Sequence, residues 1–432
     1  MINIWVIYLL EGIVLDKVKV LEEAEKCFEC ENAPCSKACP SGRDIPSFIG
    51  EIKEENINGA LEILMENNPF PGACGWVCPA PCQDRCIHEK MDGEKVQIRD
   101  LEGYVAEEGE VEIEAVEPDK GKEVAIIGSG PAGLTAGYFL VKDGYKVDVY
   151  EKLPEAGGML RYGVPDFRLP REILNKDIAR IEKTGVEIKL ETPVEDIDSL
   201  FNREYDALLV AIGAHKPRWV NIPGEELERV IHAVPFLRKA NLGQEMDLGE
   251  KVAVIGCGDV ALDAVRFANK MGSEAFILYR RSKKEMPAYD EEYEAAREEG
   301  IKFNFQVSPK RILGENGRVT SIKCLKTELG EPDSSGRRRP VPIEESEFKI
   351  EVDNIIEAVS QQTDSAWLKN NSLEIGGRKY IKSDEDSSPY NTSREGVFAA
   401  GVVVTGTKTV SEAVGTAKKA VKSIEEYLEG SS

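Results

Sequence analysis

The chain has little positive charge for its length. Its 432 residues include 55 Lys and Arg against 78 Asp and Glu, which gives a formal net charge of −23. Proteins that bind nucleic acid neutralise phosphates with a basic surface, and docking on an anionic membrane also needs basic residues. The sequence therefore argues against nucleic-acid and membrane partners, and the charge favours solubility through self-repulsion.

The chain also lacks an apolar run long enough to cross a bilayer. The run at the N-terminus ends at Leu10, before Glu11, at about half of the ~20 residues that a membrane-spanning helix needs. A basic n-region and an A-x-A cleavage site are absent, so the run is a poor signal peptide. We expect a packing segment here and a cytoplasmic protein.

Histidine is scarce, with only His88, His215 and His232. None of them stands in a zinc motif, and no Ser–His–Asp arrangement or hydrolytic metal site is visible. We therefore expect no catalytic side-chain nucleophile, so the chemistry must come from bound cofactors.

A glycine-rich turn follows the apolar strand expected at 123–127. The turn residues are Gly128, Gly130, Pro131, Ala132 and Gly133. The glycines allow a tight turn, close approach of a pyrophosphate and close packing of helix on strand, and the following helix offers free N–H groups. The next strand ends in Glu151, whose carboxylate suits a ribose hydroxyl and repels a 2′-phosphate. The pattern predicts a dinucleotide site for FAD.

A second turn of this kind follows the strand expected at 251–255. Its residues are Gly256, Gly258, Asp259 and Val260, with Ala261 in the place of the third glycine. The next strand ends in Arg280 and Arg281 rather than in an acid. Guanidinium groups suit an adenosine 2′-phosphate, so this site is predicted to bind NADPH. Two unlike nucleotide sites in one chain indicate hydride transfer between their cofactors.

Eight of the ten cysteines lie between residues 27 and 86. They are Cys27, Cys30, Cys35 and Cys39, followed by Cys74, Cys78, Cys82 and Cys86. The first run, C-x2-C-x4-C-x3-C-P, is close to the bacterial ferredoxin pattern, in which the fourth Cys serves another cluster. A disulfide framework and structural zinc are the alternatives. Two [4Fe–4S] clusters are the favoured interpretation.

Several segments resemble one family of electron-transfer proteins. They are AGGMLRYGVPDFRLP (156–170), AIGAH (211–215), YRRSKKEMPA (279–288), LKTELGEPDSSGRRRPVPIE (325–344) and GVFAAG (396–401). Together they resemble the small subunit of NADPH-dependent glutamate synthase. They are also similar to the N-terminal half of dihydropyrimidine dehydrogenases and to the large subunit of bifurcating NADH-dependent ferredoxin:NADP oxidoreductases. The resemblance covers nearly the whole chain.

The resemblance implies contacts that spacing alone does not give. For FAD it implies Glu151, Gly158, Met159, Leu160, Arg168, Gly401, Thr409 and Val410. For the clusters it implies Cys27, Cys30, Cys35 and Cys86 at the first, and Cys39, Cys78, Cys82 and Glu102 at the second. Cys74 is then free, although the short spacing of Cys78 and Cys82 leaves Cys74 as an alternative ligand.

The chain departs from the family pattern beside the flavin. The family usually has Gly-Asp where this chain has Gly401-Val402. Valine cannot accept the ribityl hydrogen bond, whose loss would cost about 1.5–3 kcal/mol of FAD affinity. We expect FAD to bind, but more weakly.

These patterns predict an α/β protein with a helical iron–sulfur domain and two Rossmann-like domains, the NADP domain inserted in the FAD domain. The predicted ranges are 1–115 for the clusters, 116–235 and 351–432 for FAD, and 236–350 for NAD(P)H.

The predicted function is that of an NADPH-dependent oxidoreductase subunit like the glutamate synthase small subunit. It would pass electrons through FAD and two [4Fe–4S] clusters to a flavin- or iron–sulfur-bearing partner subunit. The alternatives are a subunit that admits electrons to a dihydropyrimidine dehydrogenase or a bifurcating transhydrogenase, and a non-catalytic scaffold.

Overall fold

The computed structural model describes residues 16–376, 380–382, 390–406 and 408–430. The apolar run predicted to be a packing segment lies outside the described residues. The chain forms two compact units. One comprises the described residues up to Arg161, Asp166–Ala214, and those from Thr363 onward. The other comprises Tyr162–Pro165 and His215–Gln362, so the first unit is discontinuous in sequence.

The N-terminal part of the first unit is helical, as predicted. Its helices are α2 (Lys17–Glu25), α3 (Pro34–Ala38), α4 (Ile45–Lys53), α5 (Ile57–Asn67), α6 (Pro71–Val77), the 3-10 turn η1 (Gln83–Arg85), α7 (His88–Asp92) and α8 (Ile98–Glu108). Asp16, Asp44 and Asn56 cap three of them by accepting a backbone N–H three residues ahead.

Helices α6 and α8 touch backbone to backbone. A Cβ atom added to Gly75 would lie 2.3 Å from the Cα atom of Gly103. Residue 75 must therefore be glycine for the helices to approach this closely. The contact holds α6, which carries Cys74, against α8, which carries Glu102.

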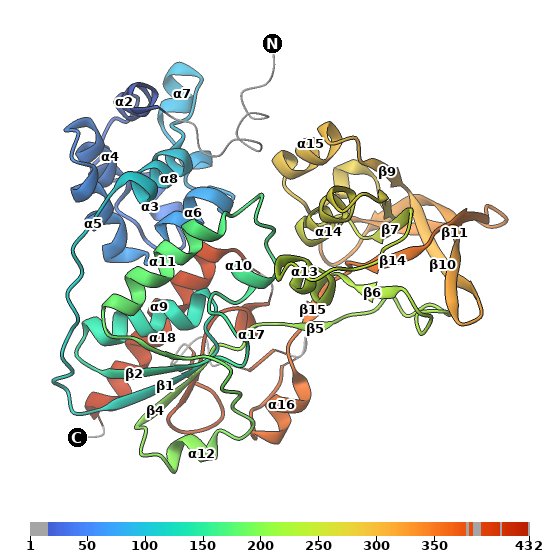
Figure 1. Ribbon diagram of the computed structural model, residues 1–432. Helices are drawn as coiled ribbons and strands as arrows, with labels where there is room; N and C mark the ends of the chain where they lie inside the picture. Colours follow the sequence, from blue (N-terminus) through green and yellow to red (C-terminus); the bar gives the residue numbers. More distant parts are fainter. Residues whose placement is uncertain (1–15, 377–379, 383–389, 407, 431–432) are drawn as a thin grey trace. The chain divides into compact units, whose positions relative to one another are not determined.

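A five-stranded parallel sheet forms the centre of the first unit. The strand order is β16 (Val397–Ala399), β4 (Ala207–Val210), β1 (Glu123–Ile127), β2 (Lys146–Tyr150) and β3 (Glu187–Lys189). Helices α9 (Pro131–Lys142) and α18 (Val410–Gly430) pack together along it (Figure 1). The remaining helices of this part are α10 (Met159–Tyr162), α11 (Arg171–Lys183), α12 (Asp198–Phe201), α16 (Ser365–Asn370) and α17 (Val402–Thr405).

The second unit has a parallel sheet of its own. Its order is β6 (Val230–His232), β14 (Asn354–Glu357), β7 (Lys251–Ile255), β8 (Glu274–Tyr279) and β9 (Lys302–Phe305). Helices α13 (Ala233–Asn241), α14 (Asp259–Lys270) and α15 (Asp290–Glu298) and the 3-10 turn η2 (Lys283–Glu285) accompany it. A short antiparallel pair, β5 (Lys216–Pro217) with β15 (Gln361–Gln362), also belongs to this unit.

Strand β14 lies in a different sheet from the one expected. Residues after 350 were expected to complete the FAD domain, but β14 pairs with β6 and β7 in the second unit. A strand buried on both faces is a plain apolar run, which does not identify its sheet. The chain returns to the first unit at Thr363, and β16 then joins β4.

An antiparallel sheet in the second unit has no counterpart in the sequence-based prediction. Its strands are β10 (Val307–Glu315), β11 (Arg318–Pro332), β12 (Arg338–Pro342) and β13 (Phe348–Glu351). Asn316 and Gly317, both with positive φ, make the turn between β10 and β11, and such a pair is the usual signal of a tight hairpin.

None of the helices in the described ranges combines the length and apolarity needed to cross a bilayer.

Candidate functional site

Four cysteines surround one pocket near the start of the chain. Cys27, Cys30, Cys35 and Cys86 line it with apolar side chains that include Ile45 and Ile49. All four thiols are half-buried. Burial raises the pKa of Cys27 and raises that of Cys35 to about 11, and ligation by a metal would replace these protons. The four residues predicted for the first cluster are thus together and fit a [4Fe–4S] group.

The other four cysteines are buried around Arg43. They are Cys39, Cys74, Cys78 and Cys82, and each acts electrostatically on the Arg43 guanidinium. Within the described residues, no three His, Cys, Asp or Glu side chains converge to hold a single metal ion. The eight cysteines thus lie in two groups, one lining a pocket and one around the Arg43 guanidinium.

The thiols of this second group are not equivalent. Burial is the largest single influence on Cys39 and acts to raise its pKa, but the charge of Arg43 together with hydrogen bonds from Ser41 and Arg43 lowers the Cys39 pKa overall. The Cys74 thiol donates a hydrogen bond to Cys78, which lowers the pKa of Cys78 and raises that of Cys74. Burial raises the pKa of Cys82 to about 12. Cys39 and Cys78 are therefore the thiols most inclined to ionise before iron binds.

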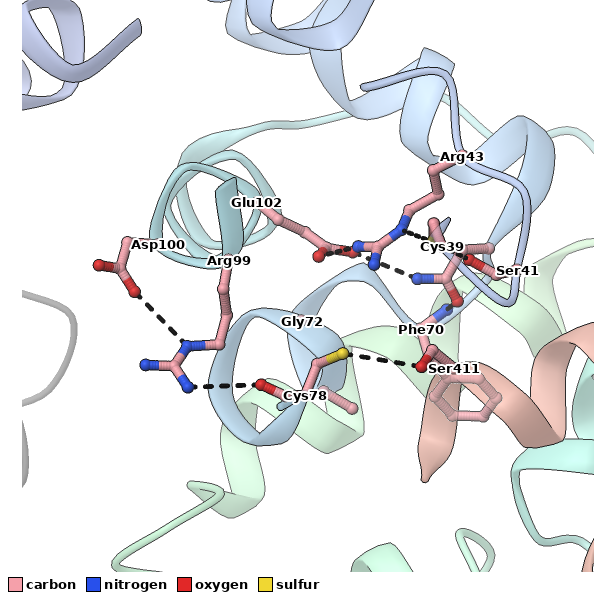
Figure 2. A network of polar contacts seen from close by, with 12 residues as sticks. Cys39, Ser41, Arg43, Phe70, Gly72, Cys78, Arg99, Asp100, Glu102 and Ser411 are labelled. Atoms are coloured by element: carbon pink, nitrogen blue, oxygen red, sulfur yellow. Dashed lines mark hydrogen bonds and ion pairs between the residues drawn. The ribbon is translucent and has the colours of Figure 1, made fainter. Parts of the chain in front are cut away.

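Glu102 is buried in the same group. Its carboxylate forms an ion pair with Arg43 and accepts a hydrogen bond from Asn68 Nδ2 at 3.3 Å (Figure 2). The predicted oxygen ligand and the alternative ligand Cys74 thus lie in one group. Both stay predictions for the fourth position of the second cluster.

Helix α18, which packs along the parallel sheet of the first unit, lies against this second group of cysteines. Cys78 Sγ lies 3.7 Å from Ser411 Oγ, and Lys418 Nζ donates to the carbonyl oxygen of Ser41 at 2.9 Å. On the neighbouring α11, Asp177 accepts the backbone N–H groups of Gly72 and Ala73. Burial raises the pKa of Asp177 to about 7. The cysteine domain and the Rossmann-like part of this unit are therefore joined by polar contacts.

The first glycine-rich turn has the geometry of a dinucleotide cradle. Gly128 has a φ of +107°, and a Cβ atom on Gly133 would lie 1.9 Å from the Gly128 carbonyl oxygen. A Cβ atom on Gly158 would lie 2.6 Å from Gly130 Cα. Only glycines allow these approaches. Helix α9 begins at Pro131 without a side-chain cap, which leaves its first N–H groups for a pyrophosphate.

Glu151 supports this turn from the end of β2. Its carboxylate accepts hydrogen bonds from Ser129 N and Ser129 Oγ at 3.0 and 2.7 Å and from Leu153 N at 2.9 Å. The residue is 6% exposed. Its predicted contact with the ribose is therefore not its only role, because it also holds the turn in shape.

The other residues predicted to hold FAD come from several segments. Met159 and Leu160 lie in α10, which follows Gly158 directly, and Arg168 lies between α10 and α11. Gly401, with a φ of +75°, begins α17 beside Ala132 of the first turn. Thr409 and Val410 stand at the start of α18. The turn, α17 and α18 offer backbone groups suited to FAD, while Val402 brings no polar side chain.

The second glycine-rich turn repeats the first in the second unit. Gly256 has a φ of +134°, and a Cβ atom there would lie 2.4 Å from the Ala358 carbonyl oxygen. Gly258 caps α14, whose first residues are Asp259 and Val260. The Asp259 carboxylate accepts the backbone N–H of Tyr289 at 3.2 Å. The turn suits a pyrophosphate, as predicted for NADPH.

Arg280 and Arg281 differ in their surroundings. Arg280 is exposed, whereas Arg281 is buried. Arg281 donates to the carbonyl oxygen of Arg338 at 2.8 Å and pairs with Asp333 at 2.6 Å. Arg281 thus anchors the β11–β12 hairpin, and Arg280 is the guanidinium presented to solvent.

Two residues of this centre were missed in the sequence. Arg43 lies among the predicted cluster ligands, but a lone arginine after Cys39 matches no known motif. Asp177 contacts residues more than one hundred positions away, a pairing that no local pattern encodes.

Two family models match the chain. Residues 122–420 match the pyridine nucleotide-disulphide oxidoreductases, and residues 12–113 match domain II of dihydropyrimidine dehydrogenase, a 4Fe-4S cluster domain.

Curated relatives and solved structures agree with these matches. The NADPH-Fe(3+) oxidoreductase subunit beta of Geobacter sulfurreducens is 38% identical over 92% of this chain, and the chain spans 64% of that protein. The glutamate synthase [NADPH] small chain of Escherichia coli is 33% identical over 94% of this chain and 91% of its own. Mycobacterium tuberculosis FprA in complex with NADPH shares the fold, with a TM-score of 0.59 and 19% identity over 73% of this chain and 85% of its own.

Proposed function

The chain belongs to the pyridine nucleotide-disulphide oxidoreductase family, and on that premise we propose that it admits electrons from NADPH to a larger complex and delivers them through two [4Fe–4S] clusters to a partner subunit. It is an FAD-dependent NAD(P)H oxidoreductase with a 4Fe-4S domain. Bound FAD would accept a hydride from NADPH and release electrons singly, which iron–sulfur clusters require.

The position of helix α18 is the observation that supports the proposal most directly. Thr409 and Val410, at the start of α18, are predicted to contact FAD, and the next residue, Ser411, lies beside Cys78 of the second cysteine group. The flavin cradle and the second cluster would thus share a structural element. This supports transfer from the flavin to the second cluster.

The difference in exposure between the two cysteine groups supports a direction of electron transfer. Cys39, Cys78 and Cys82 are buried, whereas Cys27, Cys30, Cys35 and Cys86 are half-buried. Phe28, beside the first pocket, is 47% exposed. The second cluster would then be an internal relay, and the first would pass electrons to the partner.

The proposed partner is a flavin- or iron–sulfur-bearing subunit like that of glutamate synthase. The glutamate synthase small chain matches this chain over nearly the full length of both. Relatives also include subunits named for Fe(3+) reduction and for NADP(+)-dependent formate dehydrogenation, so the family serves several partners.

The first experiment is anaerobic purification with assays for flavin, iron and sulfide. The proposal expects about one FAD and eight irons per chain, with bleaching of the flavin absorption by NADPH. A content of four irons per chain would mean one cluster instead of two. Clusters without flavin would contradict the proposed electron path. Reduction of a dye by NADPH then separates an enzyme from a scaffold, which would show none.

The partner is tested by supplying the substrates of glutamate synthase. Extract from the source cells, depleted of this chain and then supplemented with it, should oxidise NADPH when glutamine and 2-oxoglutarate are added together. A rate independent of these substrates, with dye reduction intact, would assign the chain to another complex of the family.

A further inference from the structure

Arg43 joins two of the residues predicted to bind the second cluster. Its Nε atom donates to Cys39 Sγ at 3.1 Å, and its guanidinium forms an ion pair with the Glu102 carboxylate. Figure 2 shows the guanidinium between these side chains, with Ser41 beside Cys39. The Arg43 and Glu102 side chains are 2% and 1% exposed. A cation this deeply buried requires negative charge around it.

Glu102 alone does not account for the placement of this cation. The guanidinium is also within electrostatic reach of Cys39, Cys74, Cys78 and Cys82, and these sulfurs, as the thiolates that ligate a cluster, would favour its charged form against the cost of burial. A salt bridge that served only to join α8 to the loop before α4 would not need the Nε contact with a sulfur atom. Arg43 is therefore directed at the sulfurs as well as at the carboxylate.

We propose that Arg43 is the counter-cation of the second cluster, raising its reduction potential and positioning Cys39 to ligate it. This inference rests on the proposed function, because it needs a cluster at this place. A fixed positive charge stabilises the more negative, reduced cluster, and hydrogen bonds to the sulfurs act in the same direction. The effect is independent of whether Glu102 or Cys74 is the fourth ligand, since Arg43 contacts Cys39 in either case.

A raised reduction potential changes which cofactor holds an electron at equilibrium. A raised potential lets the second cluster accept an electron readily from the flavin. Arg43→Gln removes the charge but keeps a polar side chain, and Arg43→Lys keeps the charge without the planar fork. Arg266 offers the matched control because it is also buried, at 1% exposure, and is paired with Glu292 and Glu299 in the second unit.

The test is a redox titration of the holoprotein followed by electron paramagnetic resonance, with iron counted in each variant. At a fixed potential, Arg43→Gln should lower the ratio of reduced to oxidised second cluster about tenfold, which is about 59 mV for one electron. Arg43→Lys should recover most of the shift. The first cluster should keep its potential in every variant, and Arg266→Gln should change neither cluster.

Equal second-cluster potentials in the wild type and Arg43→Gln would overturn the inference. If Arg43→Gln retains only the first cluster, Arg43→Lys decides: a second cluster near its wild-type potential supports the counter-cation, and its loss from both variants overturns it in favour of a packing role. A wild-type protein without a second cluster would instead refute the proposed function. The two failures are thus distinguished by the iron content of the wild type.

Discussion

Cys78 Sγ lies 3.7 Å from Ser411 Oγ, which places a predicted cluster ligand against the first turn of a helix of the Rossmann-like fold. The two residues are separated by more than three hundred positions in the chain. This contact links the cysteine domain to the helix whose start is predicted to meet FAD. Three predictions concern this contact and its surroundings, and a fourth concerns two arginines of the second unit.

Removing the Ser411 hydroxyl should make the second cluster harder to reduce. The Cys78 thiol donates to Ser411 Oγ, and once Cys78 is a cluster-bound thiolate the hydroxyl would donate instead. Ser411→Ala deletes that donor, and hydrogen bonds to cluster sulfurs favour the reduced state. The midpoint potential should become more negative without loss of flavin. Ser423→Ala is the control, because its hydroxyl lies in the same helix and donates to the Lys419 carbonyl oxygen at 3.4 Å. An unchanged potential in Ser411→Ala would show that the contact does not persist in the holoprotein.

The fourth ligand of the second cluster can be identified by a pair of variants. If Glu102 ligates iron, Glu102→Ala should reduce the iron content or convert the spectrum of the second cluster, while Cys74→Ser should retain eight irons. The reverse pattern would assign the position to Cys74. Iron analysis and electron paramagnetic resonance of the two proteins make the measurement.

Asp177 should make stability depend on pH. Its folded pKa is raised from 3.8 to about 7, chiefly by burial, so between these values the folded state holds a proton that the unfolded chain has released. The contribution is therefore fully present below pH 3.8 and is lost as pH rises to about 7.

Asp177→Asn should reduce the slope by this contribution, which is a few kcal/mol at most across the window, while Glu357 and Glu425, whose pKa values are also raised to about 7, keep the remainder. Melting temperatures of the holoprotein from pH 5 to 8 provide the measurement. Asp290→Asn, at an exposed carboxylate, should leave the slope as in the wild type. A slope in Asp177→Asn equal to that of the wild type would contradict the contribution of Asp177.

Arg280 and Arg281 should respond differently to substitution. Arg280→Ala should raise the KM for NADPH at least about tenfold and leave that for NADH nearly unchanged, because a bidentate charge contact with phosphate is worth about 1.5–3 kcal/mol. Arg281→Ala should instead lower the melting temperature, since it removes the bonds to Asp333 and Arg338. Steady-state kinetics with both nucleotides checks the pair, and equal effects on the two nucleotides in Arg280→Ala would remove the 2′-phosphate assignment.

Local chemistry explains what the sequence predicted correctly. The turns at Gly128 and Gly256 were predictable because positive φ and backbone contact exclude other residues there. The cysteine pocket of Cys27, Cys30, Cys35 and Cys86 followed from short spacings and the family resemblance. These features are encoded within a few residues of one another or in a recurrent motif.

Long-range pairing explains what the sequence did not predict. The place of β14 depends on which strand lies beside it, and its apolar residues would suit either sheet. The partnership of Arg43 with Glu102 and the backbone contacts of Asp177 arise only when distant helices meet. The ion pair of Arg281 with Asp333 was not predicted either, because Asp333 lies far along the chain.

The sheet of the first unit is interrupted in sequence, and this affects the order in which the newly synthesised chain can fold. Strand β4 ends at Val210, but its neighbour β16 begins only at Val397. At a synthesis rate of about 5–20 residues per second, the ribosome needs roughly 10–40 s to make the intervening chain. The second unit, nearly continuous from His215 to Gln362, is complete before the flavin cradle can close. Binding of FAD is therefore expected to be a late event. A nascent chain stalled before β16 would hold its second unit folded and its predicted flavin site open.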